Sequence, residues 1–171
     1  ATVCRRVFPR GGKENISLTP GNLNTMFPPA FENLRSRQGL LAHELAHQWF
    51  GDLVNCKDWS HIWLNEGFAS FYDLLYTEHK DGRDEFLYRL YEDAKSLTAT
   101  TNTVKSIVWR KYGDPNEQFD SLAYGKGSWV LNMLRNQLGP DLYRRCIKTY
   151  VERHKFGNVV TEDLRAVVEE L

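Results

Sequence analysis

Apolar residues recur every three or four positions along most of the chain, and this spacing predicts amphipathic helices. The helices expected from it run from near residues 33–38 to about Gly51, from Ile62 to Lys80, from Asp84 to about Leu97, from Tyr124 to Gly139, from Pro140 to near Gly157, and from Thr161 onward. Thr161 is expected to cap the last of them through its hydroxyl group.

Two stretches lack the helical spacing. Residues 3–19 combine short apolar pieces with Pro9 and two adjacent glycines, which suits a strand and a loop. Residues 98–120 are expected to form an irregular connection with one short extended piece around Ile107 to Trp109. The predicted fold class is therefore mainly α, or α+β overall, with a short N-terminal strand region.

The aromatic residues of the second expected helix are assigned to the core. Phe68, Phe71 and Tyr72 recur with Leu75 at helical spacing, which is more typical of packing than of a substrate or cofactor site. On the following helix, the charged side chains are assigned to solvent; they are Arg89, Glu92, Asp93 and Lys95.

Length and charge narrow the range of functions. The 171 residues suffice for one compact domain, and 22 basic residues balance 22 acidic ones without a long run of either sign. This balance argues against binding nucleic acid or a membrane surface through bulk electrostatics, and no apolar run is long enough to span a bilayer. Cys4, Cys56 and Cys146 lie far apart without Cys-x-x-Cys spacing, so buried, inert thiols are expected.

The segment from Leu40 to Phe50 is apolar except for two histidines, a glutamate and a glutamine. On a helix, His43 and His47 lie one turn apart on the same side, so both can bind one divalent cation through a ring nitrogen. Glu44 is offset from this pair and can reach a reacting water without being a ligand. The pattern is the H-E-x-x-H motif of zinc metalloproteases, and its ligand types favour zinc among divalent ions.

A third protein ligand is usual in catalytic zinc sites. Glu66 follows His47 by 19 positions, which allows one helix to end and a second to run back past it. Alone, such a glutamate would more often be a solvated helix residue. Its apolar neighbours Trp63, Leu64 and Phe68 favour an inward orientation instead.

Several motifs resemble the M1 family of zinc aminopeptidases, the aminopeptidase N-like gluzincins. The motifs are HELAHQWFGD at residues 43–52, WLNEGFA at 63–69, GGKEN at 11–15, which is similar to the family's Gly-x-Met-Glu-Asn exopeptidase motif, and YGKG at 124–127, which is similar to its catalytic-tyrosine segment. They occur in the family's order and cover most of the chain. The resemblance implies a thermolysin-like zinc-peptidase catalytic domain.

The same resemblance implies zinc-dependent hydrolysis of the N-terminal peptide bond of peptides. One Zn²⁺ per chain would be held by His43, His47 and Glu66. Glu44 would act first as general base and then as general acid, while the Tyr124 hydroxyl would stabilise the developing oxyanion.

Substrate binding is implied for the GGKEN segment. Glu14 would hold the free α-ammonium group of the substrate, and Gly11 and Gly12 would hydrogen-bond its backbone. Lys13 stands where the family commonly has Met, and its ammonium group could compete with the substrate amine for Glu14.

Two other functions stay open. A zinc endopeptidase would need no amine anchor at Glu14, and a noncatalytic binding module with a zinc-stapled helix pair would need neither Glu44 nor Tyr124. The start at Ala1 without Met, and the apolar stripe that ends at Leu171, indicate that residues 1–171 are a single partial catalytic domain of a larger multidomain metallopeptidase. The expected partners are a peptide with a free N-terminus and the missing domains of the parent chain, with no nucleic acid and no membrane segment in this chain. The isolated fragment could fold without being active.

Overall fold

The computed structural model describes residues 2–5, 12–13, 15–21, 38–99 and 105–171. Their elements are β1 (Thr2–Arg5), β2 (Leu18–Gly21), α1 (Gln38–Ala46), β3 (Val54–Cys56), the 3₁₀ turn η3 (Trp59–His61), α2 (Trp63–Asp81), α3 (Arg83–Ala99), the 3₁₀ turn η4 (Pro115–Gln118), the π-helical turn η5 (Leu122–Lys126), α4 (Gly127–Leu138), α5 (Pro140–His154), β4 (Gly157–Val159) and α6 (Thr161–Glu170). The prediction of a mainly helical fold is confirmed. No helix in these ranges combines the length and apolar character needed to cross a membrane.

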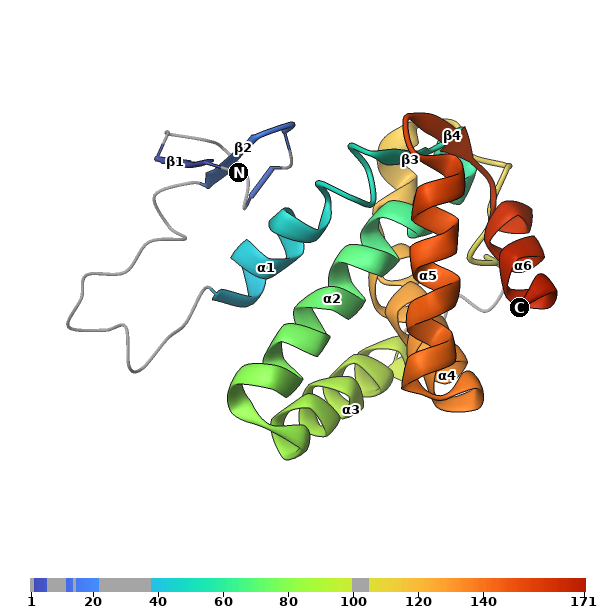
Figure 1. The fold of residues 1–171 in the computed structure, drawn as a ribbon. Helices are drawn as coiled ribbons and strands as arrows, with labels where there is room; N and C mark the ends of the chain where they lie inside the picture. Colours follow the sequence, from blue (N-terminus) through green and yellow to red (C-terminus); the bar gives the residue numbers. More distant parts are fainter. Residues whose placement is uncertain (1, 6–11, 14, 22–37, 100–104) are drawn as a thin grey trace.

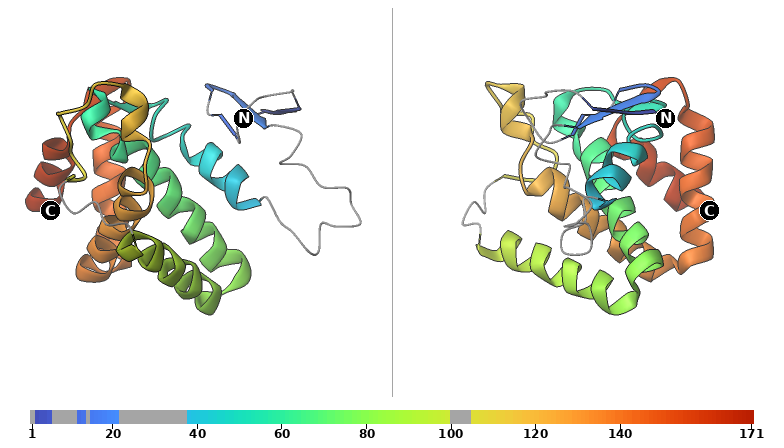
Figure 2. Two further views of the ribbon diagram at one scale, coloured as in Figure 1. Left: turned by 180° about the vertical axis from the view of Figure 1, so that it is seen from behind. Right: turned by 90° about the vertical axis from the view of Figure 1, so that its left-hand side faces the viewer.

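Helix α2 lies at the centre of the fold and packs against α1, α3 and α4 (Figure 1). Strands β1 and β2 lie beyond α1 at one end of the molecule, whereas α6 lies beside α5 at the other end (Figures 1 and 2). Phe68 of α2 is completely buried, and its ring stacks between Phe50, 4.2 Å away between centroids, and Tyr150, 5.9 Å away. This stack joins α2 to the turn after α1 and to α5, as the core assignment of Phe68 predicted.

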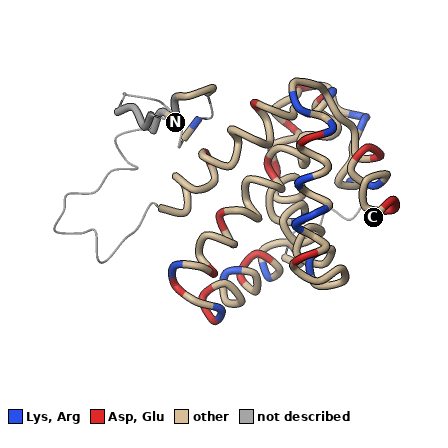
Figure 3. Tube along the Cα trace, viewed as in Figure 1, with Lys and Arg blue, Asp and Glu red and all other residues tan. Residues whose placement is uncertain are grey.

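Charged residues are distributed unevenly among the helices (Figure 3). Charged residues of both signs are spread along α3 and α5, whereas the only charged residue of α1 is Glu44, which is buried. Because a buried carboxylate needs a partner or a task, Glu44 is a candidate for chemistry rather than for packing.

Two short parallel sheets hold loops in place. Strand β1 pairs with β2, with Thr2 opposite Leu18, and β3 pairs with β4, with Val54 opposite Gly157. The second pairing is extended by a hydrogen bond of 2.8 Å from the Lys57 amide to the Val159 carbonyl. It therefore ties the segment between α1 and α2 to the segment between α5 and α6.

Helices α2 and α4 approach each other closely at two glycines. A Cβ atom on Gly67 would lie 2.9 Å from the Cα of Gly127, and one on Gly127 would lie 2.8 Å from the Cα of Gly67. Backbone atoms cannot move aside as a flexible side chain can, so only glycine fits at this crossing. The crossing brings the residue before Gly67, Glu66, close to the η5 turn that precedes α4.

We expect Gly67→Ala to destabilise the fold by about 1–3 kcal/mol, the usual effect of overpacking a core, because α2 and α4 must separate. Chemical denaturation of the variant measures this difference. Gly113→Ala is the matched control, since the nearest atom to its new Cβ lies 3.9 Å away. Equal stability of the two variants would show that the crossing tolerates a methyl group.

The first helix is shorter than predicted. It ends at Ala46 rather than near Gly51, because the amides of Gln48 and Trp49 turn to carbonyls three residues back, at 3.1 and 3.0 Å. Gly51 then adopts φ +136°, a conformation that glycine reaches at little cost, and the chain reverses. His47 consequently lies just after the helix.

Two further expectations are wrong. Residues Ile107 to Trp109 form no strand, and the connection around them is ordered instead by η4. Thr161 does not cap α6: it is the first helical residue, and its hydroxyl oxygen lies 2.9 Å from both His61 Nδ1 and Trp63 Nε1. The N-terminus of α6 is held instead by the Asp163 side chain, which accepts a hydrogen bond from the Val160 amide at 2.8 Å.

The assignment of Arg89 to solvent is also wrong. Its guanidinium donates to both carboxylate oxygens of Asp73 on α2, at 2.7 and 3.1 Å, and also reaches the Thr77 hydroxyl. This bidentate ion pair joins α2 to α3 and restrains the angle between the two helices. The periodic pattern placed Arg89 on the polar face of α3 but did not show that Asp73 faces it.

Two of the three thiols expected to be buried and inert can be described, whereas the side chain of Cys4 lies outside the described part of the structure. Cys56 and Cys146 are free and buried. Burial, together with the charge of Asp58, raises the pKa of Cys56 to about 11, and burial raises that of Cys146. A raised pKa means less of the reactive thiolate at any given pH.

At pH 8 we therefore expect neither Cys56 nor Cys146 to react with a disulfide reagent such as Ellman's until the protein is unfolded. Mass spectrometry of the labelled peptides checks the result thiol by thiol. Labelling of Cys56 in the native protein at the rate of a free thiol would contradict it.

Candidate active site

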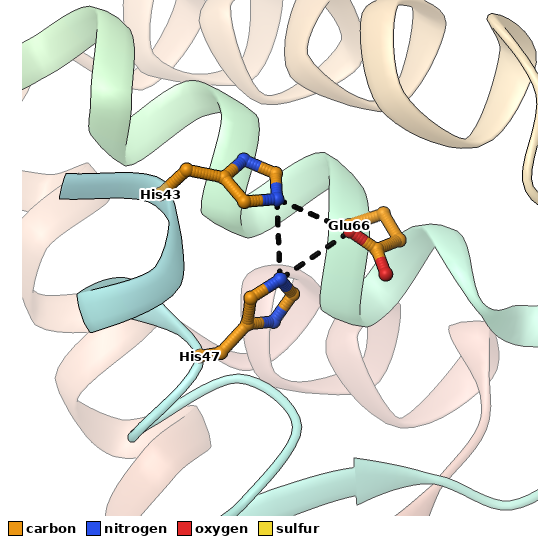
Figure 4. Close-up of side chains that lie close together, drawn as sticks. All are labelled: His43, His47 and Glu66. Carbon is orange, nitrogen blue, oxygen red and sulfur yellow. Dashed lines mark hydrogen bonds and ion pairs between the residues drawn. The ribbon is translucent and has the colours of Figure 1, made fainter. Parts of the chain in front are cut away.

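Three side chains predicted as metal ligands converge in the structure (Figure 4). The Nε2 atoms of His43 and His47 lie 3.2 Å apart, and each lies 3.3 Å from Oε2 of Glu66. His43 comes from α1, His47 from the turn that follows it, and Glu66 from the first turn of α2. Contact between α1 and α2 thus unites residues that the sequence separates.

The chemistry of these three atoms fits a bound cation. Nδ1 of His47 lies 2.9 Å from the carbonyl oxygen of Phe50, which can only accept a hydrogen bond, so Nδ1 carries the proton and Nε2 keeps its lone pair. That lone pair faces the Glu66 carboxylate, an arrangement of two acceptors that calls for a cation between them. Tetrahedral ligands at about 2.0–2.1 Å from zinc stand about 3.3–3.4 Å apart, in agreement with the separations here.

Glu66 is ionised in this setting. Burial raises the pKa of its carboxyl group, but when the facing imidazoles carry protons their contacts with Glu66, from His43 and His47, outweigh burial and hold the pKa at about 2. The adjacent Asn65 stabilises the start of α2, since its side chain accepts from the Cys56 amide at 3.2 Å and donates to Asn55 at 3.0 Å. A negatively charged ligand is therefore held on a well-anchored turn.

Glu44 is buried on the wall of the same cavity as the three ligands. It is not a member of the ligand cluster, which agrees with its predicted role beside the metal rather than on it. The backbone of Gly12 passes directly over it, and a Cβ on Gly12 would lie 2.7 Å from Glu44 Cγ. A side chain at position 12 would displace the Glu44 side chain, so glycine leaves this carboxylate in its place.

Tyr124 lies in the η5 turn rather than at the start of an α-helix as predicted. Asp120 holds this turn by accepting from the amides of Leu122 and Ala123 at 2.9 and 3.1 Å. The Tyr124 ring stacks on the His43 ring, with centroids 5.9 Å apart and planes inclined by 16°. The Tyr124 ring, which projects from this π-helical turn, therefore lies next to the ligand cluster.

A cavity of about 990 Å³ contains the whole cluster. Gly12 and Lys13 form part of one wall, and Trp59 and Phe119 form another, with ring centroids 5.7 Å apart. Both rings are partly exposed, at 44% and 39%. The cavity is therefore large enough for a peptide and has polar and aromatic walls.

Some of the predicted site residues cannot be placed. Gly11 and Glu14 lie outside the described residues, next to Gly12 and Lys13. Sequence reasoning assigned no role to Asp120, although an acidic residue four positions before the tyrosine is a usable signal for the start of a turn. It also assigned no role to Gln48, which directly follows the second histidine of the H-E-x-x-H motif.

The chain resembles known proteins in both sequence and structure. Residues 1–171 match the Peptidase family M1 domain. Aminopeptidase M1-D of Oryza sativa subsp. japonica is 32% identical, over 96% of this chain and 20% of that protein. Aminopeptidase N of Lactobacillus delbrueckii subsp. lactis is 38% identical, over 73% of this chain and 16% of that protein. The chain spans about a fifth of the length of these curated relatives.

Solved structures agree on the fold. A mutant M1 zinc metallopeptidase from Deinococcus radiodurans, with a Tyr-Ser-Ala substrate bound, superposes with a TM-score of 0.79 at 26% identity, over 98% of this chain and 35% of that one. Yeast LTA4 hydrolase in complex with bestatin gives a TM-score of 0.81 at 24% identity, over 96% of this chain and 27% of that one, and shows the fold alone.

Proposed function

The chain belongs to peptidase family M1, and from this premise we propose that it carries the catalytic centre of a zinc-dependent aminopeptidase. Its reaction would be hydrolysis of the N-terminal peptide bond of a peptide with a free α-amino group. The observation that carries the proposal is the convergence of His43, His47 and Glu66 in one cavity with Glu44. The family assignment agrees with the resemblance found in the sequence.

One Zn²⁺ per chain is proposed, held by His43 Nε2, His47 Nε2 and Glu66 Oε2. When bound, the metal supplies a Lewis acid that polarises the scissile carbonyl and makes water easier to deprotonate. The Phe50 carbonyl contributes by fixing the proton of His47 on Nδ1, at 2.9 Å, so that Nε2 points to the metal.

Glu44 is proposed to move the proton. Its carboxylate accepts a proton from the attacking water and then delivers it to the nitrogen of the leaving amine, which departs neutral. Its burial under the Gly12 backbone keeps bulk water away from this transfer.

Tyr124 and Glu14 complete the proposal. The Tyr124 hydroxyl donates to the oxygen of the scissile carbonyl as negative charge develops there, and its stacking on His43 holds the ring at the ligand cluster. Glu14, assigned through the family motif, receives the α-ammonium group, with Gly11 and Gly12 along the substrate backbone. This anchor at the substrate N-terminus would make the enzyme an exopeptidase.

We further infer that residues 1–171 are one partial catalytic domain and that other domains of the parent chain complete the walls of the cavity. The length ratio to the curated relatives supports this inference. Peptides with free N-termini would be the substrates, and those domains would be the partners.

Hydrolysis of leucyl-4-nitroanilide and of its N-acetyl derivative by the zinc-loaded protein tests the proposal. We expect release of nitroaniline from the free substrate alone. Equal cleavage of both would instead identify an endopeptidase, and bound zinc in the full-length parent chain without cleavage of either substrate or of longer peptides would identify a noncatalytic zinc site.

A further inference from the structure

Gln48 makes three hydrogen bonds with a single amide group. Its Oε1 accepts from the Ser17 backbone amide at 3.0 Å, while its Nε2 donates to the Asn15 carbonyl at 2.9 Å and to Asp52 Oδ2 at 2.9 Å. Asn15 and Ser17 belong to the N-terminal segment, and Asp52 to the reversal after α1. One side chain therefore joins both segments immediately after the metal ligand His47.

The segment that Gln48 holds forms the cavity wall next to Glu44. Gly12 and Lys13 line the cavity, and the Gly12 backbone lies so close to Glu44 that no side chain fits between them. Asn15 and Ser17 of the same segment both hydrogen-bond to the Gln48 side chain. The depth of this wall thus depends on Gln48.

The backbone of the segment is shaped for this contact. Ser17 adopts φ +64°, a left-handed conformation that is unfavourable for a residue other than glycine. The Ser17 amide in this conformation points at Gln48 Oε1. Strained backbone of this kind persists where surrounding contacts hold it.

Only an amide satisfies all three partners. The Ser17 amide requires an acceptor, while the Asn15 carbonyl and the Asp52 carboxylate require donors. A carboxylate of the same shape would keep the first bond and place negative charge against the other two oxygens. Glutamine is therefore specified by its hydrogen-bonding pattern as well as by its length.

We propose that Gln48 is a positioning residue that fastens Asn15 and Ser17 to the turn that carries His47 and so sets the distance between the backbone at Gly12 and Glu44. The proposal rests on the proposed function only where it refers to substrate; the fastening itself is a property of the fold. Gln48 touches no reacting atom and acts through the segment that it holds.

Amide hydrogen exchange by NMR and steady-state kinetics of Gln48→Glu test this proposal in the zinc-loaded protein. We expect the Ser17 and Asn15 amides to exchange about tenfold faster, because the new carboxylate repels the Asn15 carbonyl and Asp52, so the segment opens more often and the remaining Ser17 bond breaks with it, while α5 amides and zinc content stay unchanged. We expect KM for leucyl-4-nitroanilide to rise at nearly constant kcat, because the wall moves and the metal does not.

A second substitution provides a rescue. Adding Asp52→Asn to Gln48→Glu restores a donor opposite the new carboxylate and should return part of the lost protection. Gln137→Glu, an exposed position on α4, is the matched control for the charge change. Unchanged exchange at Ser17 in Gln48→Glu, or exchange that rises equally in α5, would overturn the proposal. Absence of turnover in the unsubstituted full-length parent chain would overturn the proposed function instead, and the exchange rates would still decide the role of Gln48.

Discussion

Glu44→Gln is expected to abolish most turnover and leave the metal bound. Glutamine has the shape of glutamate but cannot take a proton from water at neutral pH, so the general-base step is lost. Such a step contributes about 10²–10⁴-fold to rate, and we expect kcat on leucyl-4-nitroanilide to fall by a factor in this range. Metal analysis of the same sample should give the zinc content of the unsubstituted protein, because Glu44 is not in the ligand cluster.

The control for this prediction is Glu169→Gln, an isosteric change at an exposed position of α6. It should leave both kcat and zinc content unaltered. If Glu44→Gln retains full activity, the proton passes through another group and the role given to Glu44 is wrong. If it loses zinc together with activity, Glu44 belongs to the metal site itself.

Glu66→Gln is expected to have the largest effect on metal binding. The substitution preserves the packing of a buried side chain but removes the negative charge that faces the two histidine nitrogens at 3.3 Å. Loss of residues that merely orient ligands lowers affinity about 10–100-fold, so loss of a charged ligand should exceed about 100-fold. Competition with a chromogenic zinc chelator measures the two affinities.

Thermal denaturation gives a second measure of the same change. Added zinc should raise the melting temperature of the unsubstituted protein and have little effect on Glu66→Gln, because an ion that binds the folded state stabilises it. Glu85→Gln, exposed on α3, is the matched control and should respond to zinc normally. An undiminished zinc response in Glu66→Gln would exclude Glu66 as a ligand.

The convergence of the three proposed ligands was predictable because their signal is local. His43 and His47 are one helical turn apart, and Glu66 lies in an apolar stretch at a distance that permits a helix reversal. The structure brings them together as predicted. The predicted end of the first helix is wrong, however. The helix ends at Ala46, and the chain reverses at Gly51, just after His47.

Other features depend on contacts between segments that are far apart in the sequence, so the spacing of apolar and polar residues does not predict them. The pairing of Arg89 with Asp73 requires the angle between two helices, and the role of Gln48 requires the N-terminal segment to pass beside it. Tyr124 was identified by resemblance, but its π-turn depends on the Asp120 side chain. Patterns along the chain therefore revealed the chemistry of the site better than the supports that hold it.

The close crossing at Gly67 and Gly127 links these supports to the site. It brings Glu66, which precedes one glycine, and Tyr124, which lies three residues before the other, to neighbouring parts of the cavity. The packing of α2 against α4 and the placement of these two side chains thus depend on the same contact between the backbones of Gly67 and Gly127.

X-ray absorption at the zinc K edge tests the central claim most directly, because it reports the atoms bound to the metal. The account predicts one zinc per chain, with imidazole nitrogens and carboxylate oxygen at about 2.0–2.2 Å and no sulfur. Sulfur at about 2.3 Å, a shell without imidazole scattering, or a protein that retains no metal after dialysis would contradict the assignment of His43, His47 and Glu66.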